Sequence, residues 1–422
     1  MLDIRYIRQN VETVKRAVQL KNDHADIDLL LATDAEKREL LTEVEELKHQ
    51  RNTVSEEVGR LKKQKQDASE IISKMKEVSE RIKLIDDKIK VIDETIYNIL
   101  IRIPNIPHAS VPQGKDESAN EVVRTWGDLP QQDFKPLPHW EVGEKLGILD
   151  LAGGAKVAGS SFINTVGLGA RLQRALIAFM LDLHVKKHGY TEVSPPYLAN
   201  RESMFGTGQL PKLEEDMYLA TLDDLFLIPT AEVTVTNLLR DVTLQDEQLP
   251  VYYTAFTPCF RREAGTYGKD TRGLIRVHQF DKVEMVKFVR PETSYDELES
   301  LLQNAEEVLQ LLGLPYRVLS LATGDLSFAA AKCYDIEVWA SGLRKWLEVS
   351  SCSNFEDFQA RRMNIRFKRN ASAKPELVHT LNGSGLALPR TVIAILENYQ
   401  TDEGTVVVPQ VLRDFMGTDI IK

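Results

Sequence analysis

The chain has 422 residues, of which 43% are hydrophobic and 27% are charged, a composition ordinary for a folded protein with a large buried core. No run of about 18 apolar residues occurs, and residues 1–8 carry charge where a signal peptide would be apolar. The formal net charge of -10 argues against indiscriminate nucleic-acid binding, because an acidic surface repels a polyanion. We therefore expect two or three domains in a cytoplasmic protein without a membrane partner, and any RNA contact should use a local basic patch.

The N-terminal part of the chain contains two runs of heptad-spaced apolar residues. Over residues 40–61 they recur at alternating steps of four and three, with Arg51 at one seam position, and over 71–99 they recur without a miss. This spacing predicts two coiled-coil helices. Because the intervening residues 62–69 are polar, we expect an antiparallel helical hairpin over about residues 36–100. At about 1.5 Å per residue, each limb would be roughly 40 Å long and would protrude from a small domain.

Basic residues gather around the expected turn of this hairpin: Lys48, Arg51, Arg60, Lys62, Lys63 and Lys65. Few acidic residues oppose them nearby. Clustered Lys and Arg on an otherwise acidic protein would make a selective site for RNA phosphates. A solvated coiled-coil surface explains this segment equally well, so both interpretations stay open at this point.

The sequence changes in character directly after Ile103. Three prolines and a glycine lie there among Asp, Glu, Ser and Asn, which is typical of a linker. We therefore expect an N-terminal domain over residues 1–103, a linker and lead-in segment over 104–160, and a catalytic domain over 161–422.

The remaining sequence predicts an antiparallel sheet. Strand-like runs occur at 251–260, 276–288, 316–322, 334–340, 345–352 and 376–380. The first two are joined by a polar, glycine-bearing loop that is too short for a crossover helix, so they should pair antiparallel. The alternating strand-helix rhythm of a doubly wound parallel sheet is missing. We therefore expect an α+β fold built on an antiparallel sheet.

Neither of the two common glycine-rich phosphate loops occurs in the chain. Instead, charged residues interrupt apolar strands, where an isolated charge is costly unless it faces a ligand. The densest group runs from Arg261 to Glu263 and resumes from Arg276 to Glu284. Arginines on adjacent strands can bind phosphate or carboxylate bidentately. A solvated hairpin with surface charges is the alternative.

A second candidate site lies near the C-terminus. Asn382 to Gly385 precedes an apolar, helix-like run with Pro389 and Arg390 in its first turn. The pattern resembles an anion-binding helix start. A glycine turn that leads into a capped core helix explains it equally well, and the neighbouring His379 is more readily structural than catalytic.

The three cysteines, Cys259, Cys333 and Cys352, are far apart and form no C-x-x-C pair. This spacing predicts neither a disulfide framework nor a zinc site. We expect reduced thiols and no zinc.

Four segments together resemble the signature segments of the seryl-tRNA synthetase family: residues 228–232, 260–284, 348–354 and 382–390. They occur in the family's order, and the hairpin matches the family's N-terminal coiled-coil arm, so the resemblance covers essentially the whole chain. It implies a class II synthetase-like antiparallel sheet flanked by helices, a tRNA-binding N-terminal domain, and a homodimer with a contact helix near residues 171–188. The implied activity is ligation of L-serine to tRNA(Ser) through seryl-adenylate, with ATP and Mg²⁺, and the family suggests tRNA(Sec) as a further substrate.

The resemblance also assigns roles to residues. Arg261 would hold the α-phosphate and the amino-acid carboxylate, Arg390 the γ-phosphate, and Glu348 with Ser351 a Mg²⁺ ion, so Arg261, Glu348 and Arg390 are the catalytic candidates. Glu263 would meet the adenine amino edge and Phe280 would stack under the base. The full ATP site would comprise Arg261, Arg262, Glu263, Arg276, Val277, Phe280, Glu348, Val349, Ser350, Ser351 and Arg390. The serine pocket would comprise Thr230, Ala231, Glu232, Arg261, Glu284 and Ser384.

Some positions depart from the family pattern. Arg262 stands where serine is common, Ser161 where arginine is expected, and Phe355 where cysteine is frequent, and the segment 344–346 is unusual. None of these removes a predicted catalytic group.

Two other functions compete with the ligase. A synthetase-like enzyme that loads a different acceptor would typically lack the arm, which this chain has. A coiled-coil scaffold with a degenerate catalytic fold would be expected to have lost Arg261, Glu284, Glu348 or Arg390, and all four are present. The ligase is therefore favoured.

Overall fold

The computed structural model describes residues 1–263 and 272–422, which form two compact units. One unit comprises Leu2–Gln19 and Asp23–Pro104. The other comprises Met1, Leu20–Asn22 and Asn105–Lys422. Each unit has a hydrophobic core of its own.

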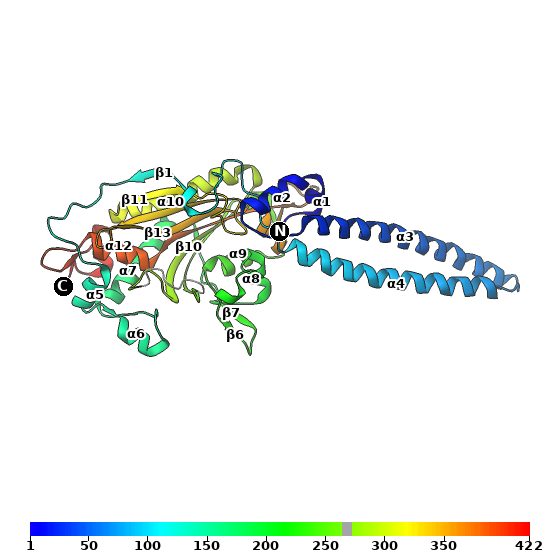
Figure 1. The fold of residues 1–422 in the computed structure, drawn as a ribbon, viewed down its shortest axis with the longest axis horizontal. Helices are drawn as coiled ribbons and strands as arrows, with labels where there is room; N and C mark the ends of the chain where they lie inside the picture. The colour runs from blue at the N-terminus through cyan, green and yellow to red at the C-terminus, as the bar shows by residue number, and fades with distance from the viewer. Residues whose placement is uncertain (264–271) are drawn as a thin grey trace. The chain divides into compact units, whose positions relative to one another are not determined.

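The first unit is built around a long helical hairpin. Its helices are α1 (Ile4–Gln9), α2 (Val11–Leu20), α3 (Ile27–Lys63) and α4 (Ser69–Leu100). Figure 1 shows α3 and α4 side by side along their lengths. At 37 residues, α3 is about 55 Å long. It begins before the expected hairpin start at about residue 36, because the Asp26 side chain caps it by accepting a hydrogen bond from the backbone N of Leu29 at 2.9 Å.

Apolar seam residues and cross-helix ion pairs hold the hairpin together. Val44 packs against Ile82 and Ile85 in a buried cluster between α3 and α4. Lys37 pairs with Asp93 at 2.6 Å, and Lys48, further along α3, pairs with Asp86 at 3.3 Å. Partner numbers on α4 therefore fall as those on α3 rise, which confirms the antiparallel arrangement that the heptad spacing predicts.

The basic residues at the hairpin turn differ in their surroundings. Lys48 forms an ion pair with Asp86, and Arg60 Nη2 lies 3.6 Å from Glu57 Oε1. Lys62 and Lys63 are exposed at the end of α3, and Lys65 is exposed in the turn that leads to α4. We call these three lysines the tip lysines.

The second unit is organised by an eight-stranded sheet with strand order β1-β11-β12-β13-β16-β10-β9-β4. The strands are β1 (Glu121–Trp126), β11 (Tyr316–Ser320), β12 (Lys332–Ala340), β13 (Lys345–Asn354), β16 (His379–Ala387), β10 (Gln279–Val289), β9 (Val251–Phe260) and β4 (Thr191–Glu192). Every neighbouring pair is antiparallel except β4 with β9. The predicted α+β fold on an antiparallel sheet is therefore confirmed.

The two faces of this sheet differ. Three helices pack on one face: α7 (Leu168–Lys186), α10 (Ser294–Leu312) and α12 (Leu388–Asn398). Val283 and Met285 of β10 join these helices in the main hydrophobic core. Because side chains alternate along a strand, Lys282 and Glu284 project from the opposite face. That opposite face carries the candidate site.

Shorter elements complete the second unit. Its other helices are α5 (His139–Lys145), α6 (Leu151–Ala158), α8 (Arg201–Thr207), α9 (Ala231–Asn237), α11 (Phe358–Met363) and α13 (Arg413–Met416). Two small sheets have two strands each: β2 (Leu149–Asp150) with β3 (Asn164–Thr165), and β17 (Val406–Val407) with β18 (Ile420–Ile421). Two others have three strands each. In one, β7 (Leu225–Leu227) lies between β5 (Leu198–Ala199) and β6 (Leu219–Ala220), and in the other, β14 (Arg366–Lys368) lies between β8 (Thr243–Gln245) and β15 (Glu376–Leu377). Residues 104–160, expected to be a linker, thus supply an edge strand of the main sheet and two helices.

The glycine-containing segment Asn382 to Gly385 is not the start of a helix. It lies inside β16, between β10 and β13, and α12 begins only at Leu388. The glycines serve close packing, because a Cβ at Gly383 would lie 2.8 Å from Cys352 Sγ and one at Gly385 would lie 2.4 Å from His184 Nε2. The glycine turn expected there is therefore wrong, whereas the helix that follows, with Pro389 and Arg390 in its first turn, is confirmed.

Within the described part of the chain, no helix is long and apolar enough to cross a membrane. All three cysteines are buried free thiols. Burial raises the pKa of each thiol above its usual range, so these cysteines behave as apolar core residues.

Candidate active site

A cavity of about 320 Å³ lies on the sheet face that carries Lys282 and Glu284, a size suited to a small-molecule ligand. Its walls come from β10, β13 and β16, from the residues just after β9, and from the starts of α9 and α12. The four signature segments, which are far apart in sequence, therefore meet in one place, together with lining residues within 207–213 and 327–329. Part of one of them, residues 264–271, lies outside the described residues.

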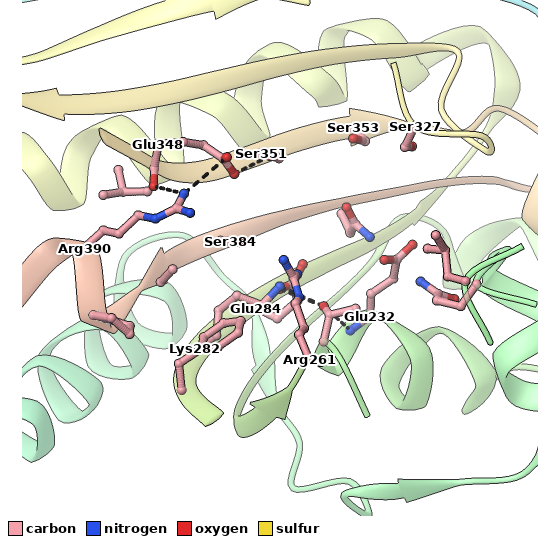
Figure 2. Close-up of a pocket in the computed structure, with 18 of the residues that line it drawn as sticks. Glu232, Arg261, Lys282, Glu284, Ser327, Glu348, Ser351, Ser353, Ser384 and Arg390 are labelled. Atoms are coloured by element: carbon pink, nitrogen blue, oxygen red, sulfur yellow. Dashed lines mark hydrogen bonds and ion pairs between the residues drawn. The ribbon is translucent and has the colours of Figure 1, made fainter. Parts of the chain in front are cut away.

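Most of the site residues predicted from the sequence line this cavity: Thr230, Glu232, Arg261, Glu263, Arg276, Val277, Phe280, Glu284, Glu348, Val349, Ser351, Ser384 and Arg390. Some of them form two charged clusters. Figure 2 shows Arg390, Glu348 and Ser351 gathered together, with Glu232, Glu284 and Arg261 gathered apart from them.

The structure places three predicted residues away from the cavity lining. Ala231 is fully buried in the core beneath α9. Ser350 points to the other face of β13, where its Oγ donates a 2.7 Å hydrogen bond to the backbone O of Ser384. Arg262 donates from Nε to the backbone O of Met217 at 2.9 Å, and its guanidinium lies 5.2 Å from the Tyr218 ring centroid. The geometry therefore does not support the prediction that these three side chains contact a ligand.

The first cluster, which we call the carboxylate cluster, consists of Thr230, Glu232, Lys282 and Glu284. Thr230 caps α9, and its Oγ1 accepts hydrogen bonds from the backbone N of Glu232 at 3.2 Å and from Lys282 Nζ at 2.8 Å. The same hydroxyl donates to Glu284 Oε2 at 3.4 Å. Lys282 Nζ lies 2.5 Å from that carboxylate oxygen. Two strand residues and a helix cap thus form one buried polar network.

The carboxyl group of Glu232 has the most strongly shifted pKa in this cluster. Burial, followed by the nearby charge of Glu284, raises the pKa of Glu232 from 4.5 to about 7. A hydrogen bond from Gln359 Nε2 to Glu232 Oε1 at 2.7 Å and the charge of Lys282 act in the opposite direction. The cavity therefore holds a carboxyl group that titrates near neutral pH, which suits a site for a cationic ligand group.

The second cluster, which we call the arginine cluster, consists of Glu348, Ser351 and Arg390. Arg390 follows the proline at the start of α12, and its Nη1 donates to the backbone O of Glu348 at 2.8 Å and to Glu348 Oε2 at 3.3 Å. Desolvation acts to raise the pKa of Glu348, but the positive charges of Arg390 and then Arg261 outweigh it, so the pKa lies below its ordinary value. Glu348 is therefore ionised at neutral pH.

Glu348 and Ser351 also have the chemistry of a magnesium site. Ser351 Oγ donates to Glu348 Oε1 at 3.1 Å, so a carboxylate and a hydroxyl oxygen already lie together at the cavity wall. Mg²⁺ typically takes one or two carboxylates and completes its shell with water and substrate phosphates. No group of three or more His, Cys, Asp or Glu side chains among the described residues is arranged to hold a metal by itself. The residues present fit a magnesium ion that arrives with a phosphate ligand.

Arg261 lies in the lining of the cavity, beside the carboxylate cluster (Figure 2). Its Nε donates to the backbone O of Pro229 at 3.3 Å, and its guanidinium lies 5.3 Å from the Phe280 ring centroid. Glu263 and Arg276 form an ion pair at 2.9 Å. Glu263 has a positive φ of 52°, a conformation that non-glycine residues seldom adopt and that concentrates at functional sites.

Several residues of the site were not predicted from the sequence, and Lys282, Asn382 and Gln359 are the ones that lie at the carboxylate cluster. Lys282 could have been found, because it precedes Glu284 by two positions on a strand and must share its face. Asn382 likewise precedes Ser384 by two positions on β16 and lines the cavity. Gln359 gave no signal, because it reaches Glu232 from α11, which is distant in sequence.

The antiparallel sheet, its helical layer and a cavity with separate arginine and carboxylate clusters define a class II aminoacyl-tRNA synthetase core. A family model described as the "tRNA synthetase class II core domain (G, H, P, S and T)" matches residues 218–399. A second model, the "Seryl-tRNA synthetase N-terminal domain", matches residues 1–107 and so includes the helical hairpin.

Individual relatives agree with these matches. Curated proteins named serine--tRNA ligase from Caldanaerobacter subterraneus subsp. tengcongensis and Carboxydothermus hydrogenoformans are 57% and 58% identical to this chain, and each comparison covers 100% of the chain and 99% of the relative. The crystal structure of a seryl-tRNA synthetase from Pyrococcus horikoshii complexed with ATP has a TM-score of 0.95 and 40% identity, covering 100% of this chain and 99% of that one. The chain belongs to the seryl-tRNA synthetase family.

Proposed function

We propose that this chain is a serine--tRNA ligase that activates L-serine with ATP and transfers it to tRNA(Ser) through seryl-adenylate. The observation that carries this proposal is the separation of charge in one cavity, with the arginine cluster at one place, the carboxylate cluster at another, and Arg261 also in the lining. The arginine cluster suits a triphosphate, and the carboxylate cluster suits an ammonium group.

In the first step, the serine carboxylate attacks the α-phosphate of ATP. An oxygen–phosphorus bond forms to the serine carboxylate, the bond from the α-phosphorus to the bridging oxygen breaks, and pyrophosphate leaves with its electron pair. The nucleophile is already ionised, so no protein base is needed, and positioning and charge neutralisation supply the catalysis. Arg261 would hold the carboxylate and the α-phosphate together, because a guanidinium can bind two anionic groups through separate N–H pairs.

The arginine cluster would hold the phosphates that leave. Arg390 would bind the γ-phosphate, and Glu348 with Ser351 would ligate Mg²⁺. When bound, the ion neutralises phosphate charge as pyrophosphate departs. The adenine would stack on Phe280 beside the apolar side chains of Val277 and Val349, with Glu263 accepting from its amino group and Arg276 steadying Glu263 through their ion pair.

The carboxylate cluster would hold the amino acid. Glu232 and Thr230 would receive the ammonium group, and Glu284 and Ser384 would bind the side-chain hydroxyl. Buried acceptors built for a hydroxyl reject the analogue that lacks it, by roughly 10⁴ to 10⁵ in the strongest cases, so alanine should be a very poor substrate. Threonine would have to be excluded by the pocket wall.

In the second step, a terminal ribose hydroxyl of the tRNA attacks the seryl carbonyl carbon and AMP leaves. We propose that the N-terminal domain, residues 1–103, binds the tRNA through its hairpin, and that tRNA(Sec) is accepted by the same route. The exposed tip lysines support a phosphate contact there. We further propose a homodimer that acts in the cytoplasm, as expected from the family.

Serine-dependent exchange of labelled pyrophosphate into ATP tests the activation step. We expect exchange with L-serine, a requirement for Mg²⁺, and little exchange with alanine or glycine. Exchange that is supported by alanine or glycine but not by serine would refute the substrate assignment. Exchange with serine followed by failure to charge any tRNA would instead favour a synthetase-like enzyme with another acceptor.

A further inference from the structure

Lys282 is a buried cation inside the amino-acid end of the cavity. Its side chain is 8% exposed, and its Nζ lies 2.5 Å from Glu284 Oε2 and 2.8 Å from Thr230 Oγ1. Glu284 is itself 3% exposed as a side chain, so the pair is shielded from solvent. None of the proposed roles in serine activation uses this ammonium group.

The charges around the amino acid balance only if Lys282 is included. The cluster and its neighbour Arg261 hold two carboxylates, Glu232 and Glu284, and two cations, Lys282 and Arg261. Serine brings one ammonium and one carboxylate. If Arg261 takes the substrate carboxylate and Glu232 takes the ammonium, Glu284 keeps Lys282 as its partner. What remains for the substrate side chain is a neutral hydrogen-bonding site.

Removing the Lys282 charge would change that balance. Glu284 would become a buried carboxylate without a cation, a costly state that a positively charged ligand group would relieve. The site would then suit an amino acid whose side chain carries a second ammonium. The geometry agrees, because Lys282 Nζ occupies the position between Thr230 Oγ1 and Glu284 Oε2 that such an ammonium would need.

We propose that Lys282 is a specificity-determining residue, whose ammonium neutralises Glu284 and so makes the pocket accept a hydroxyl side chain and reject a cationic one. This inference rests on the proposed serine activation. The informative substrate is L-2,3-diaminopropionate, which matches serine in size and carries an ammonium in place of the hydroxyl. Like-charge repulsion with Lys282 should exclude it from the wild-type pocket.

The test compares Lys282→Met with a control on the same strand. Methionine keeps an unbranched chain of similar length without the charge. Lys287→Met is the matched control, because Lys287 is 1% exposed as a side chain and pairs with Glu297 at 2.9 Å, and it does not line the cavity. Both variants lose a buried lysine–glutamate pair, so a general loss of stability should affect both.

Pyrophosphate exchange is measured with L-serine and with L-2,3-diaminopropionate, and thermal unfolding reports folding. We expect the ratio of kcat/KM for serine to that for diaminopropionate to fall by about tenfold or more in Lys282→Met, since close charge pairs control discrimination by at least this factor. The ratio should stay at the wild-type value in Lys287→Met. An unchanged ratio in Lys282→Met, or an equal change in both variants, would overturn the proposal.

A measurement on the unmodified enzyme keeps the inference testable if Lys282→Met does not fold. Diaminopropionate should inhibit wild-type serine-dependent exchange only at concentrations far above the KM for serine. Inhibition at concentrations near that KM would overturn the role of Lys282 while leaving serine activation intact. Absence of serine-dependent exchange in the wild type would overturn the proposed function itself.

Discussion

His139 and Glu397 form a fully buried pair in which the imidazole Nδ1 lies 2.8 Å from Glu397 Oε1. The other ring nitrogen, Nε2, accepts a 3.0 Å hydrogen bond from the backbone N of Leu274. Since Nε2 accepts, Nδ1 must carry the proton and donate to the carboxylate. Leu274 lines the cavity, so this pair supports the wall of the proposed nucleotide site from behind.

Replacing His139 with alanine should weaken both folding and ATP binding. The change leaves the Leu274 N–H without its acceptor and deprives a buried carboxylate of one donor, which should cost about 3 kcal/mol of unfolding free energy. We also expect the KM for ATP to rise while the KM for serine changes little. Denaturant unfolding and exchange kinetics check these effects, with His24→Ala, an exposed histidine, as the control. Equal behaviour of the two variants would show that the pair does not support the site.

Replacing Glu348 with glutamine should impair magnesium-dependent activation. We expect kcat/KM for exchange to fall by about 100-fold, the order seen when one group that stabilises developing charge is removed. The Mg²⁺ concentration needed for half-maximal exchange should rise as well. A magnesium titration of the exchange reaction measures both effects.

Glu337→Gln provides the control for this experiment. Glu337 lies opposite Glu348 in the β12–β13 pairing, but its carboxylate pairs with Arg317 at 2.5 Å, and it does not line the cavity that holds the carboxylate and arginine clusters. Its magnesium requirement should match the wild type. A wild-type magnesium requirement in Glu348→Gln would contradict the assignment of Glu348 as the metal ligand.

The raised pKa of Glu232 predicts a pH-dependent affinity for serine. Burial and the charge of Glu284 bring the pKa of Glu232 to about 7, so this acid ionises as pH rises from 6 to 8. Because only the ionised form attracts the substrate ammonium, the KM for serine should fall over this range. Glu232→Gln should raise the KM and abolish this pH dependence. A serine KM that is flat between pH 6 and 8 in the wild type would count against Glu232 as the ammonium acceptor.

The same shift has the opposite consequence for stability. The native state binds more protons than the unfolded state between pH 4.5 and about 7, because the pKa of Glu232 is raised on folding. The free energy of unfolding therefore loses this contribution as pH rises through that window. We expect Glu232→Gln to raise the melting temperature relative to wild type more at pH 8 than at pH 5. A difference of the reverse sign would mean that Glu232 is not held in an unfavourable charged state.

Deleting residues 35–100 and closing the gap should separate the two steps of the reaction. Pyrophosphate exchange should remain largely intact, because the cavity is lined entirely by residues from 207 onward. Charging of tRNA should collapse, because the hairpin is proposed to supply the RNA contact. Equal loss of both activities would refute the role of the arm.

A milder version of this experiment replaces the tip lysines Lys62, Lys63 and Lys65 with alanine. Charging should weaken, and its dependence on salt should become shallower by about one unit of log–log slope for each lost phosphate contact. Exchange should be unaffected.

Sequence periodicity predicted the hairpin well and the glycine segment poorly, for one physical reason. The heptad-spaced apolar residues, such as Val44 on α3 and Ile85 on α4, form a helix–helix contact, and each helix shows the spacing in its own sequence. Gly383 and Gly385 instead report contacts with Cys352 and His184, which lie on elements distant in sequence. In the sequence, a glycine that allows another element to pack closely cannot be distinguished from a glycine that allows a turn.

The site shows the same limit. The charged residues on β10 could be placed on one face by counting, and the family resemblance grouped them with β13 and β16. Alternation alone would turn Ser350 away from the cavity, because it neighbours Ser351 on the strand. That Glu348 and Ser351, three positions apart, share the cavity wall could not be predicted, because it depends on a bulge that shifts the register between β12 and β13 beside Glu337. Edge strand β1 was missed because all its residues are exposed and none alternates with a core position.

The most direct test of the central claim is charging of tRNA(Ser) by the purified chain with labelled serine, ATP and Mg²⁺, alongside a tRNA for another amino acid. We predict that label enters tRNA(Ser), that it does not enter the other tRNA, and that omission of ATP abolishes the signal. Serine-dependent pyrophosphate exchange without any transfer of serine to tRNA(Ser) would contradict the account.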